Sequence, residues 1–143
     1  ATLILGASSG GQTGSIDELP PGTVVIDDSF PRIFDDAAAW QRMTSRKDGL
    51  VLGGGTLDVG PLERSSPFPQ AAAIRALHPT RWLPGCHAEA VLLAAKPELG
   101  ATQGVVTVER ATAVLEAVLE LGWQAAPLHL GAWEVPAELV SGA

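Results

Sequence analysis

The sequence of 143 residues contains one cysteine, no tyrosine and no long apolar run. The single cysteine, Cys86, excludes an internal disulfide, and no spacing of cysteine and histidine resembles a zinc site. No apolar segment reaches the about 18 residues that a membrane-spanning helix requires. These absences predict a protein of the reducing cytoplasm, with no bound metal and no membrane span.

Basic residues are also scarce, since nine Lys and Arg stand against sixteen Asp and Glu, for a formal net charge of −7. A surface that binds nucleic acid needs clustered Lys and Arg to neutralise phosphates. The sequence offers one such cluster, at residues 42–47, and its composition is typical of a solvated loop. Binding of DNA or RNA is therefore disfavoured.

The first residues of the chain lack the features of a signal peptide. Residues 1–6 are apolar and contain neither a basic segment nor an initiator methionine. Residues of this kind are typical of a strand inside a fold. We therefore expect the chain to be a fragment of a longer protein, either cut from it or encoded in this form.

Three apolar segments, at residues 1–7, 23–27 and 49–52, predict buried strands of a parallel sheet. Each is followed by a polar or glycine-rich turn. In parallel α/β sheets the turns after the strands share one edge, where ligands bind. We expect such a shared edge to be formed by residues 8–11, 27–29 and 53–55.

Helical patterns are predicted at residues 35–42 and 70–77, and again at 86–96 and 107–121. Strands with glycine-rich exits that are followed by helices predict an α/β architecture. Residues 123–130 are expected to be a final strand or an extended arm. The core-facing stripe of the last helix is expected to consist of Val108, Ala111, Leu115, Val118 and Leu119.

Residues 6–11, Gly-Ala-Ser-Ser-Gly-Gly, invite comparison with the nucleotide-binding fingerprint of short-chain dehydrogenases. That fingerprint requires a long helix directly after it, whose N-terminus faces the pyrophosphate. Here Gly14 and the pair Pro20-Pro21 interrupt the following segment, and the tyrosine that serves as the acid in that class is absent. A later turn of a Rossmann sheet, which lines the ribose and nicotinamide, fits these residues better.

Cys86 opens a predicted helix, where unpaired backbone N–H groups and the helix dipole stabilise a thiolate. It is therefore either a nucleophile or a buried structural cysteine. Glu89 lies three residues later on the same face of that helix. It either orients the thiol or a substrate, or it caps the first turn of the helix.

Several segments, in their order along the chain, resemble one family. Residues 2–9 and 19–31 resemble the later half of a shikimate-dehydrogenase-like Rossmann domain. Two further segments narrow the resemblance to one family within that superfamily. They are residues 49–56, Gly-Leu-Val-Leu-Gly-Gly-Gly-Thr, and residues 85–93, Gly-Cys-His-Ala-Glu-Ala-Val-Leu-Leu. They are similar to the carboxyl-terminal half of the long-chain acyl-acyl-carrier-protein reductases, NADPH-dependent enzymes that form fatty aldehydes.

The resemblance covers most of residues 1–134 and implies the second half of a Rossmann-like parallel sheet with flanking helices. Residues 135–143 are then expected to form a tail. The implied partners are an acyl-carrier protein or an acyl-coenzyme A, together with the amino-terminal nucleotide-binding half of the family, which this chain lacks.

The resemblance also implies site residues. Cys86 falls on the family's catalytic cysteine, which holds the acyl group as a thioester until hydride from NADPH releases an aldehyde. Glu89 falls on an acidic position of the same helix. The loops that would line NADPH contain Ser8, Ser9, Gly54 and Gly55.

Two other functions stay open on the sequence. One is another shikimate-dehydrogenase-like NAD(P) oxidoreductase in which Cys86 is incidental. The other is a binding or assembly domain that keeps the fold without catalysis. Replacing Cys86 by alanine distinguishes thioester reduction from both alternatives, because thioester reduction requires the thiol and the other two functions do not.

Overall fold

The computed structural model describes residues 2–11, 14–61 and 81–141, and the chain divides into two compact units. Unit 1 consists of Ala1–Gly55 together with Pro127–Ala143, and unit 2 consists of Thr56–Ala126. The fold is mixed α/β, with one small parallel sheet and further antiparallel strands. The helix expected at residues 70–77 lies outside the described residues.

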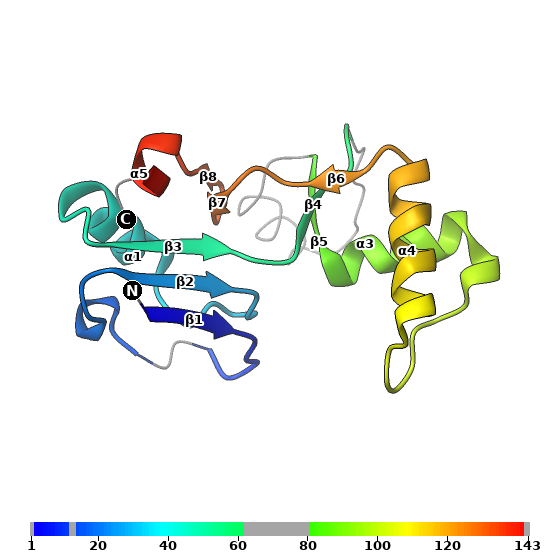
Figure 1. The fold of residues 1–143 in the computed structure, drawn as a ribbon, viewed down its shortest axis with the longest axis horizontal. Helices are drawn as coiled ribbons and strands as arrows, with labels where there is room; N and C mark the ends of the chain where they lie inside the picture. Colours follow the sequence, from blue (N-terminus) through cyan, green and yellow to red (C-terminus); the bar gives the residue numbers. More distant parts are fainter. Residues whose placement is uncertain (1, 12–13, 62–80, 142–143) are drawn as a thin grey trace, which may run out of the picture. The chain divides into compact units, whose positions relative to one another are not determined.

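The three apolar segments expected to be strands form the parallel sheet of unit 1. These strands are β1 (Thr2–Gly6), β2 (Thr23–Asp27) and β3 (Gly49–Gly53), in the order β1-β2-β3 (Figure 1). The prediction of three parallel strands is confirmed. The prediction that all three are buried is wrong for β1, in which only Gly6 is buried, because this strand lies at the edge of the sheet.

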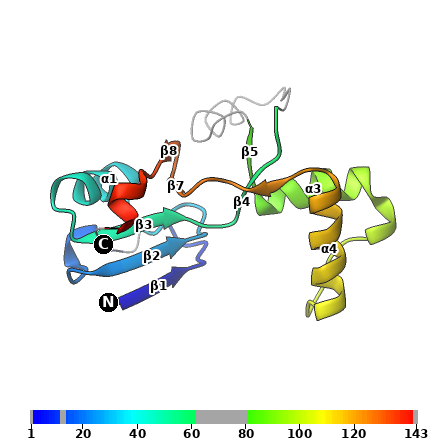
Figure 2. The same ribbon diagram turned by 45° about the horizontal axis from the view of Figure 1, so that its top comes forward.

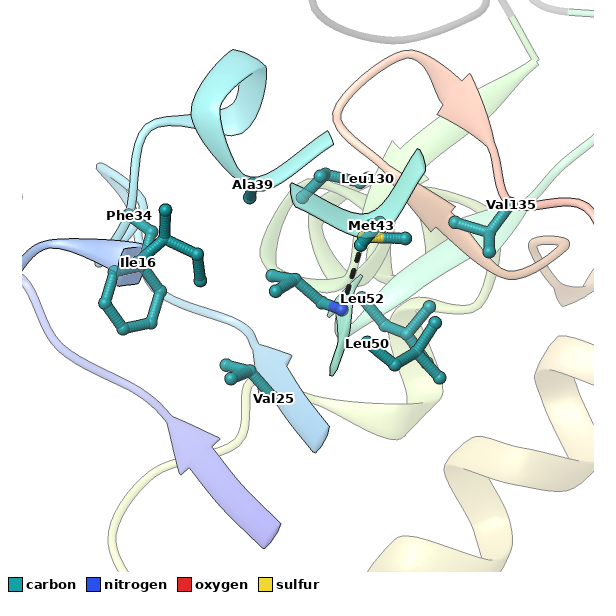
Figure 3. Packing of buried hydrophobic residues seen from close by; sticks show 10 residues of the cluster. Ile16, Val25, Phe34, Ala39, Met43, Leu50, Leu52, Leu130 and Val135 are labelled. Atoms are coloured by element: carbon teal, nitrogen blue, oxygen red, sulfur yellow. Dashed lines mark hydrogen bonds between the residues drawn. The ribbon is translucent and has the colours of Figure 1, made fainter. Parts of the chain in front are cut away.

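One face of this sheet is covered by α1 (Asp36–Ser45). The helix begins at the N-cap Asp35, whose side chain accepts a hydrogen bond of 2.8 Å from the amide of Ala38. Met43 of α1 is buried, and its Sδ lies 3.3 Å from the amide nitrogen of Val51 in β3 (Figure 3).

On the other face of the sheet, Leu3 and Leu5 of the edge strand β1 are exposed.

The end of the chain returns to unit 1. It forms the short strands β7 (His129–Leu130) and β8 (Trp133–Glu134) and then the helix α5 (Ala137–Ser141). Leu130 and Val135 are buried in the same core as the sheet and α1. The prediction of a tail over residues 135–143 is therefore wrong for Val135, which is buried in this core, and for Ala137–Ser141, which are helical.

Unit 2 has an antiparallel sheet of three short strands. They are β4 (Thr56–Asp58), β5 (Trp82–Pro84) and β6 (Gln124–Ala125), in the order β5-β4-β6. The final strand expected at residues 123–130 is thus divided between β6 in this unit and β7 in unit 1. Strands this short carry little periodicity in the sequence, so their pairing was not predictable.

The helices of unit 2 are α3 (Gly85–Ala95) and α4 (Val108–Glu120), with a short 3-10 helix at Pro97–Leu99 between them. Both predicted helices are confirmed, and α4 begins as expected at the N-cap Thr107, which accepts a bond of 3.2 Å from Arg110. Figures 1 and 2 both show α4 crossing α3. Their shared core contains Leu83, Ala88, Leu92, Ala117 and Trp123.

The predicted core-facing stripe of α4 is wrong, except for Val118. Ala117 is buried, and Val114 and Val118 are partly buried against the same core. The side chains of Val108, Leu115 and Leu119 are instead exposed. Since both stripes of this helix are apolar, the sequence alone could not show which one faces the core.

Candidate functional site

The loops that follow the three parallel strands meet at one edge of unit 1, as the sequence predicted. The amide of Asp28 donates to the carbonyl oxygen of Gly6 over 2.8 Å. The amide of Gly54 donates to the carbonyl oxygen of Asp27 over 2.9 Å. The end of β1 is therefore bonded to the loop after β2, and the loop after β3 is bonded to the end of β2.

The two aspartates at the end of β2 have different environments. Asp27 is buried, and its carboxylate accepts bonds from the amides of Ser29 at 2.9 Å and Ile33 at 2.8 Å. Asp28 is exposed. From the sequence alone, an acidic pair after a strand is expected to be a solvated turn. That expectation is wrong for Asp27, which is buried and fixes the backbone of the following loop.

The predicted cofactor residues Gly54 and Gly55 lie against the side chain of Asp28. A Cβ atom at Gly54 would be 3.2 Å from the Asp28 Cβ, and one at Gly55 would be 2.8 Å from the Asp28 Cγ. Gly55 also has a positive φ of 63°. Glycine is thus required at Gly55 twice, for its backbone conformation and for the space taken by the carboxylate.

Ser8, on the loop after β1, belongs to the same edge. Its amide donates to Ser29 Oγ over 2.8 Å. Its own Oγ is buried and has no hydrogen-bond partner among the described residues. A buried hydroxyl without a protein partner is available to a bound molecule. The neighbouring Ser9 is exposed.

A second polar cluster lies beside this edge, and sequence reasoning missed it. A Cβ atom at Gly53 would be 2.7 Å from Arg32 Nη2 and 2.9 Å from His129 Nε2. Arg32 also donates to the carbonyl of Asp27. Because Arg32 and His129 are far apart in the sequence, no local motif could have linked them.

Burial shifts the pKa values of His129, in this cluster, and of Asp36, which Arg32 also influences. It lowers the pKa of His129 from its ordinary value of 6.5, and Arg32 adds to the shift while the bond to the Pro127 carbonyl opposes it. Burial also raises the pKa of Asp36, with Arg32 opposing that shift. His129 is therefore favoured in its neutral form.

The predicted nucleophile, Cys86, lies in unit 2 and is exposed. It is the second residue of α3, which starts directly after β5. The N-cap of α3 is Pro84, and no side chain among the described residues caps it. The expectation of a cysteine in a first helical turn is confirmed, and the alternative of a buried structural cysteine is wrong.

An ion pair anchors the strand that carries α3. Arg81 lies 2.8 Å from the buried carboxylate of Asp58, which also accepts a bond of 3.0 Å from the amide of Gly60. Arg81 is the main cause that holds the pKa of Asp58 below its ordinary value. This pair fixes the start of β5 against β4, where Trp82 is opposite Asp58.

The other residue predicted to be catalytic, Glu89, lies on α3 three residues after Cys86 and is half-buried. Ala88 and Leu92 are the buried residues of this helix. The structure therefore keeps Cys86 and Glu89 on one helix in unit 2 and the four loop residues on one edge in unit 1.

Comparison of the sequence with protein-family models and with curated proteins finds no match. No described helix is long and apolar enough to cross a membrane. Within residues 2–11, 14–61 and 81–141, no group of three or more His, Cys, Asp or Glu side chains could hold a metal ion. The family resemblance stays a prediction.

Proposed function

We propose that this chain is the carboxyl-terminal, Rossmann-like part of an NADPH-dependent reductase that converts an acyl thioester to an aldehyde through Cys86. The observation that carries the proposal is the exposed thiol in the first turn of α3. Helix N-termini stabilise negative charge, and a thiolate is the reactive form of cysteine. Exposure gives a large acyl substrate access to the sulfur.

The first step needs only groups of this chain and the substrate. The Cys86 thiolate attacks the carbonyl carbon, the bond from that carbon to the carrier sulfur breaks, and the carrier leaves as a thiol after taking a proton. Backbone N–H groups of the first turn of α3 can donate to the carbonyl oxygen as its charge develops. The acyl group is then a thioester on Cys86.

NADPH, when bound, supplies the hydride that reduces this thioester to the aldehyde, with Cys86 returning to the thiolate. In unit 1, the buried Ser8 Oγ and the exposed Asp28 beside Gly54 and Gly55 fit hydroxyl groups of a ribose. The carboxylate of Asp28 does not suit a phosphate. We therefore assign the ribose and nicotinamide part of the cofactor, and not its pyrophosphate, to this edge.

Intact-mass spectrometry after incubation with palmitoyl-coenzyme A tests the covalent step. We expect one acyl adduct on the chain and none on Cys86→Ala, because the chain has a single cysteine. Ser9→Ala, which changes another exposed small residue, is the matched control and should keep the adduct. A wild-type chain that stays unmodified, or an adduct that persists in Cys86→Ala, contradicts the proposal.

The same assay separates the two roles of Glu89. If Glu89 orients the thiol or the substrate, Glu89→Gln slows adduct formation about tenfold and leaves the melting temperature unchanged. If it stabilises the helix instead, the melting temperature falls and the rate of acylation stays constant.

A further inference from the structure

The exposed side of α4 carries an apolar stripe. Val108, Leu115 and Leu119 have exposed fractions of 78%, 57% and 60%. Because successive helical residues are about 100° apart, these three side chains lie within about 40° of one another around the helix axis. The buried Ala117 lies on the opposite side, so this stripe is separate from the one that packs in the core of unit 2.

The segment directly before the helix carries two further exposed apolar side chains. Val105 and Val106 have exposed fractions of 94% and 53%, and they precede the N-cap Thr107. Isolated apolar residues at a surface need no explanation, but a continuous set along one helix is typical of an interaction site.

An acidic ridge flanks the stripe on one side. Glu109, Glu116 and Glu120 also lie within about 40° of one another and about 100° around the axis from the apolar stripe. Bonds to its own backbone amide and to Thr107 hold the pKa of Glu109 below its ordinary value. All three side chains are exposed, but Glu120 is paired with Lys96 over 2.7 Å. The negative charge along this flank of the apolar surface therefore comes mainly from Glu109 and Glu116.

We propose that this face of α4, defined by Val108, Leu115 and Leu119 with the acidic ridge, binds an amphipathic helix of a partner protein whose apolar face is flanked by Lys and Arg. Apolar side chains at this helical spacing match the anchors of helix-on-helix recognition. The charge of the ridge selects a basic partner by complementarity. The proposal does not depend on the reductase activity.

The charge also argues against the other occupants. A second copy of the chain brings the same net charge of −7 and the same glutamates, so like charges oppose its association. An anionic membrane and an acidic carrier protein are disfavoured at this face for the same reason. A basic helix is the occupant that gains from both the stripe and the ridge.

Fluorescence anisotropy with a labelled synthetic helix tests the proposal on the whole chain. The probe is an amphipathic peptide of leucine and lysine, and its counterpart carries glutamate in place of every lysine. We expect the lysine peptide to bind at least about tenfold more tightly than the glutamate peptide, with an affinity that falls as salt rises. Equal binding of the two peptides overturns the proposal.

Two variants locate the binding. The double variant Leu115→Gln and Leu119→Gln should weaken binding of the lysine peptide by about tenfold or more. Glu116→Lys should weaken it several-fold and reduce its salt dependence. The matched control is Leu128→Gln in unit 1, which alters a leucine of 49% exposure and should leave binding unchanged. Since these side chains are exposed, the circular dichroism spectrum should not change.

The remaining outcomes overturn the proposal. A loss of binding that is as large in Leu128→Gln as in the double variant means non-specific attraction of a basic peptide to an acidic protein. Concentration-dependent dimerisation that the double variant abolishes means that a second copy occupies this face. Binding to phosphatidylcholine vesicles that the double variant abolishes means that the stripe is a membrane contact.

Discussion

Unit 1 and unit 2 bury charged groups in different ways. In unit 1, the buried Arg42 donates to the backbone carbonyls of Ile16 and Leu19 and to the carboxylate of Asp48. In the described part of unit 2, Asp58 is the buried charged side chain, and its partner Arg81 is exposed. In unit 1, a buried arginine therefore joins separate segments of the chain, whereas in unit 2 a buried aspartate is paired with an exposed arginine.

The difference fits the roles that we propose for the two units. In unit 1, Arg42 joins the segments that precede β2 and β3. At the opposite edge of the sheet, the buried Asp27 fixes the loop after β2 by accepting bonds from Ser29 and Ile33. Unit 2 exposes Cys86 and the outer stripe of α4, for which we propose contacts with other molecules. A small core with exposed helices suits that role. The following predictions test this contrast through the stability of each unit.

The four tryptophans allow each unit to be followed separately. Trp40 and Trp133 of unit 1 have ring centroids 5.4 Å apart. Trp82 and Trp123 are buried in unit 2. In protein that contains 5-fluorotryptophan, urea titration by ¹⁹F NMR therefore reports unfolding through two signals for each unit.

The largest effect is expected from Arg42→Met. The change leaves a buried carbonyl, a partly buried carbonyl and Asp48 without the buried guanidinium that joins them, so the free energy of unfolding of unit 1 should fall by about 3–5 kcal/mol. The signals of the unit 1 tryptophans should shift to lower urea. Arg46→Met, at an exposed arginine that also contacts Asp48, is the control and should have little effect. Equal losses in the two variants would refute the buried anchor.

Leu130→Ala and Leu92→Ala compare the two cores. Both leucines are almost fully buried, Leu130 in unit 1 and Leu92 in unit 2, so each change should cost about 2–5 kcal/mol in its own unit. Each variant should move the tryptophan signals of its own unit more than those of the other. If every signal moves together, the units unfold as one and the contrast between them fails.

A smaller effect is expected from pH in unit 1, through His129. Its pKa in the folded protein lies below the ordinary 6.5, so the unfolded chain binds more protons as the pH falls below that value. The stability that His129 contributes is complete above 6.5 and is lost toward lower pH. His129→Gln, which does not titrate, should flatten the stability of unit 1 in this range. A profile unchanged by His129→Gln would exclude this residue as the cause.

The smallest effect is expected in unit 2, from Asp58. Its pKa is held below the ordinary 3.8, mainly by Arg81, so its contribution is present above that value and is lost as the pH falls further. Asp58→Asn should reduce the acid-dependent loss of unit 2, to which Glu109 also contributes, without changing the profile of unit 1. A loss of unit 2 stability between pH 5 and 6 that depends on Asp58 would contradict this assignment.

Much of the local structure could be predicted from the residues. The strands of unit 1 followed from continuous apolar runs, and α4 followed from its N-cap Thr107. The position of Cys86 in a first helical turn followed from the change in pattern after Pro84. These features depend on neighbouring residues, and so a sequence contains their cause.

The errors have a common origin. The core-facing stripe of α4 and the burial of Asp27 depend on which other segments cover them. The same holds for the pairing of β4 with β5 and β6, which joins separate parts of the sequence. No periodicity within one segment contains this information.

The sequence by itself determined the charge, the single thiol, the parallel strands and the glycine-rich turns that follow them. Tertiary structure alone decided that Arg32 and His129 meet at Gly53, that the Ser8 hydroxyl is buried without a protein partner, and that the outer stripe of α4 is exposed. The physical reason is that local conformation follows from neighbouring residues, whereas burial and long-range contacts follow from how distant segments pack.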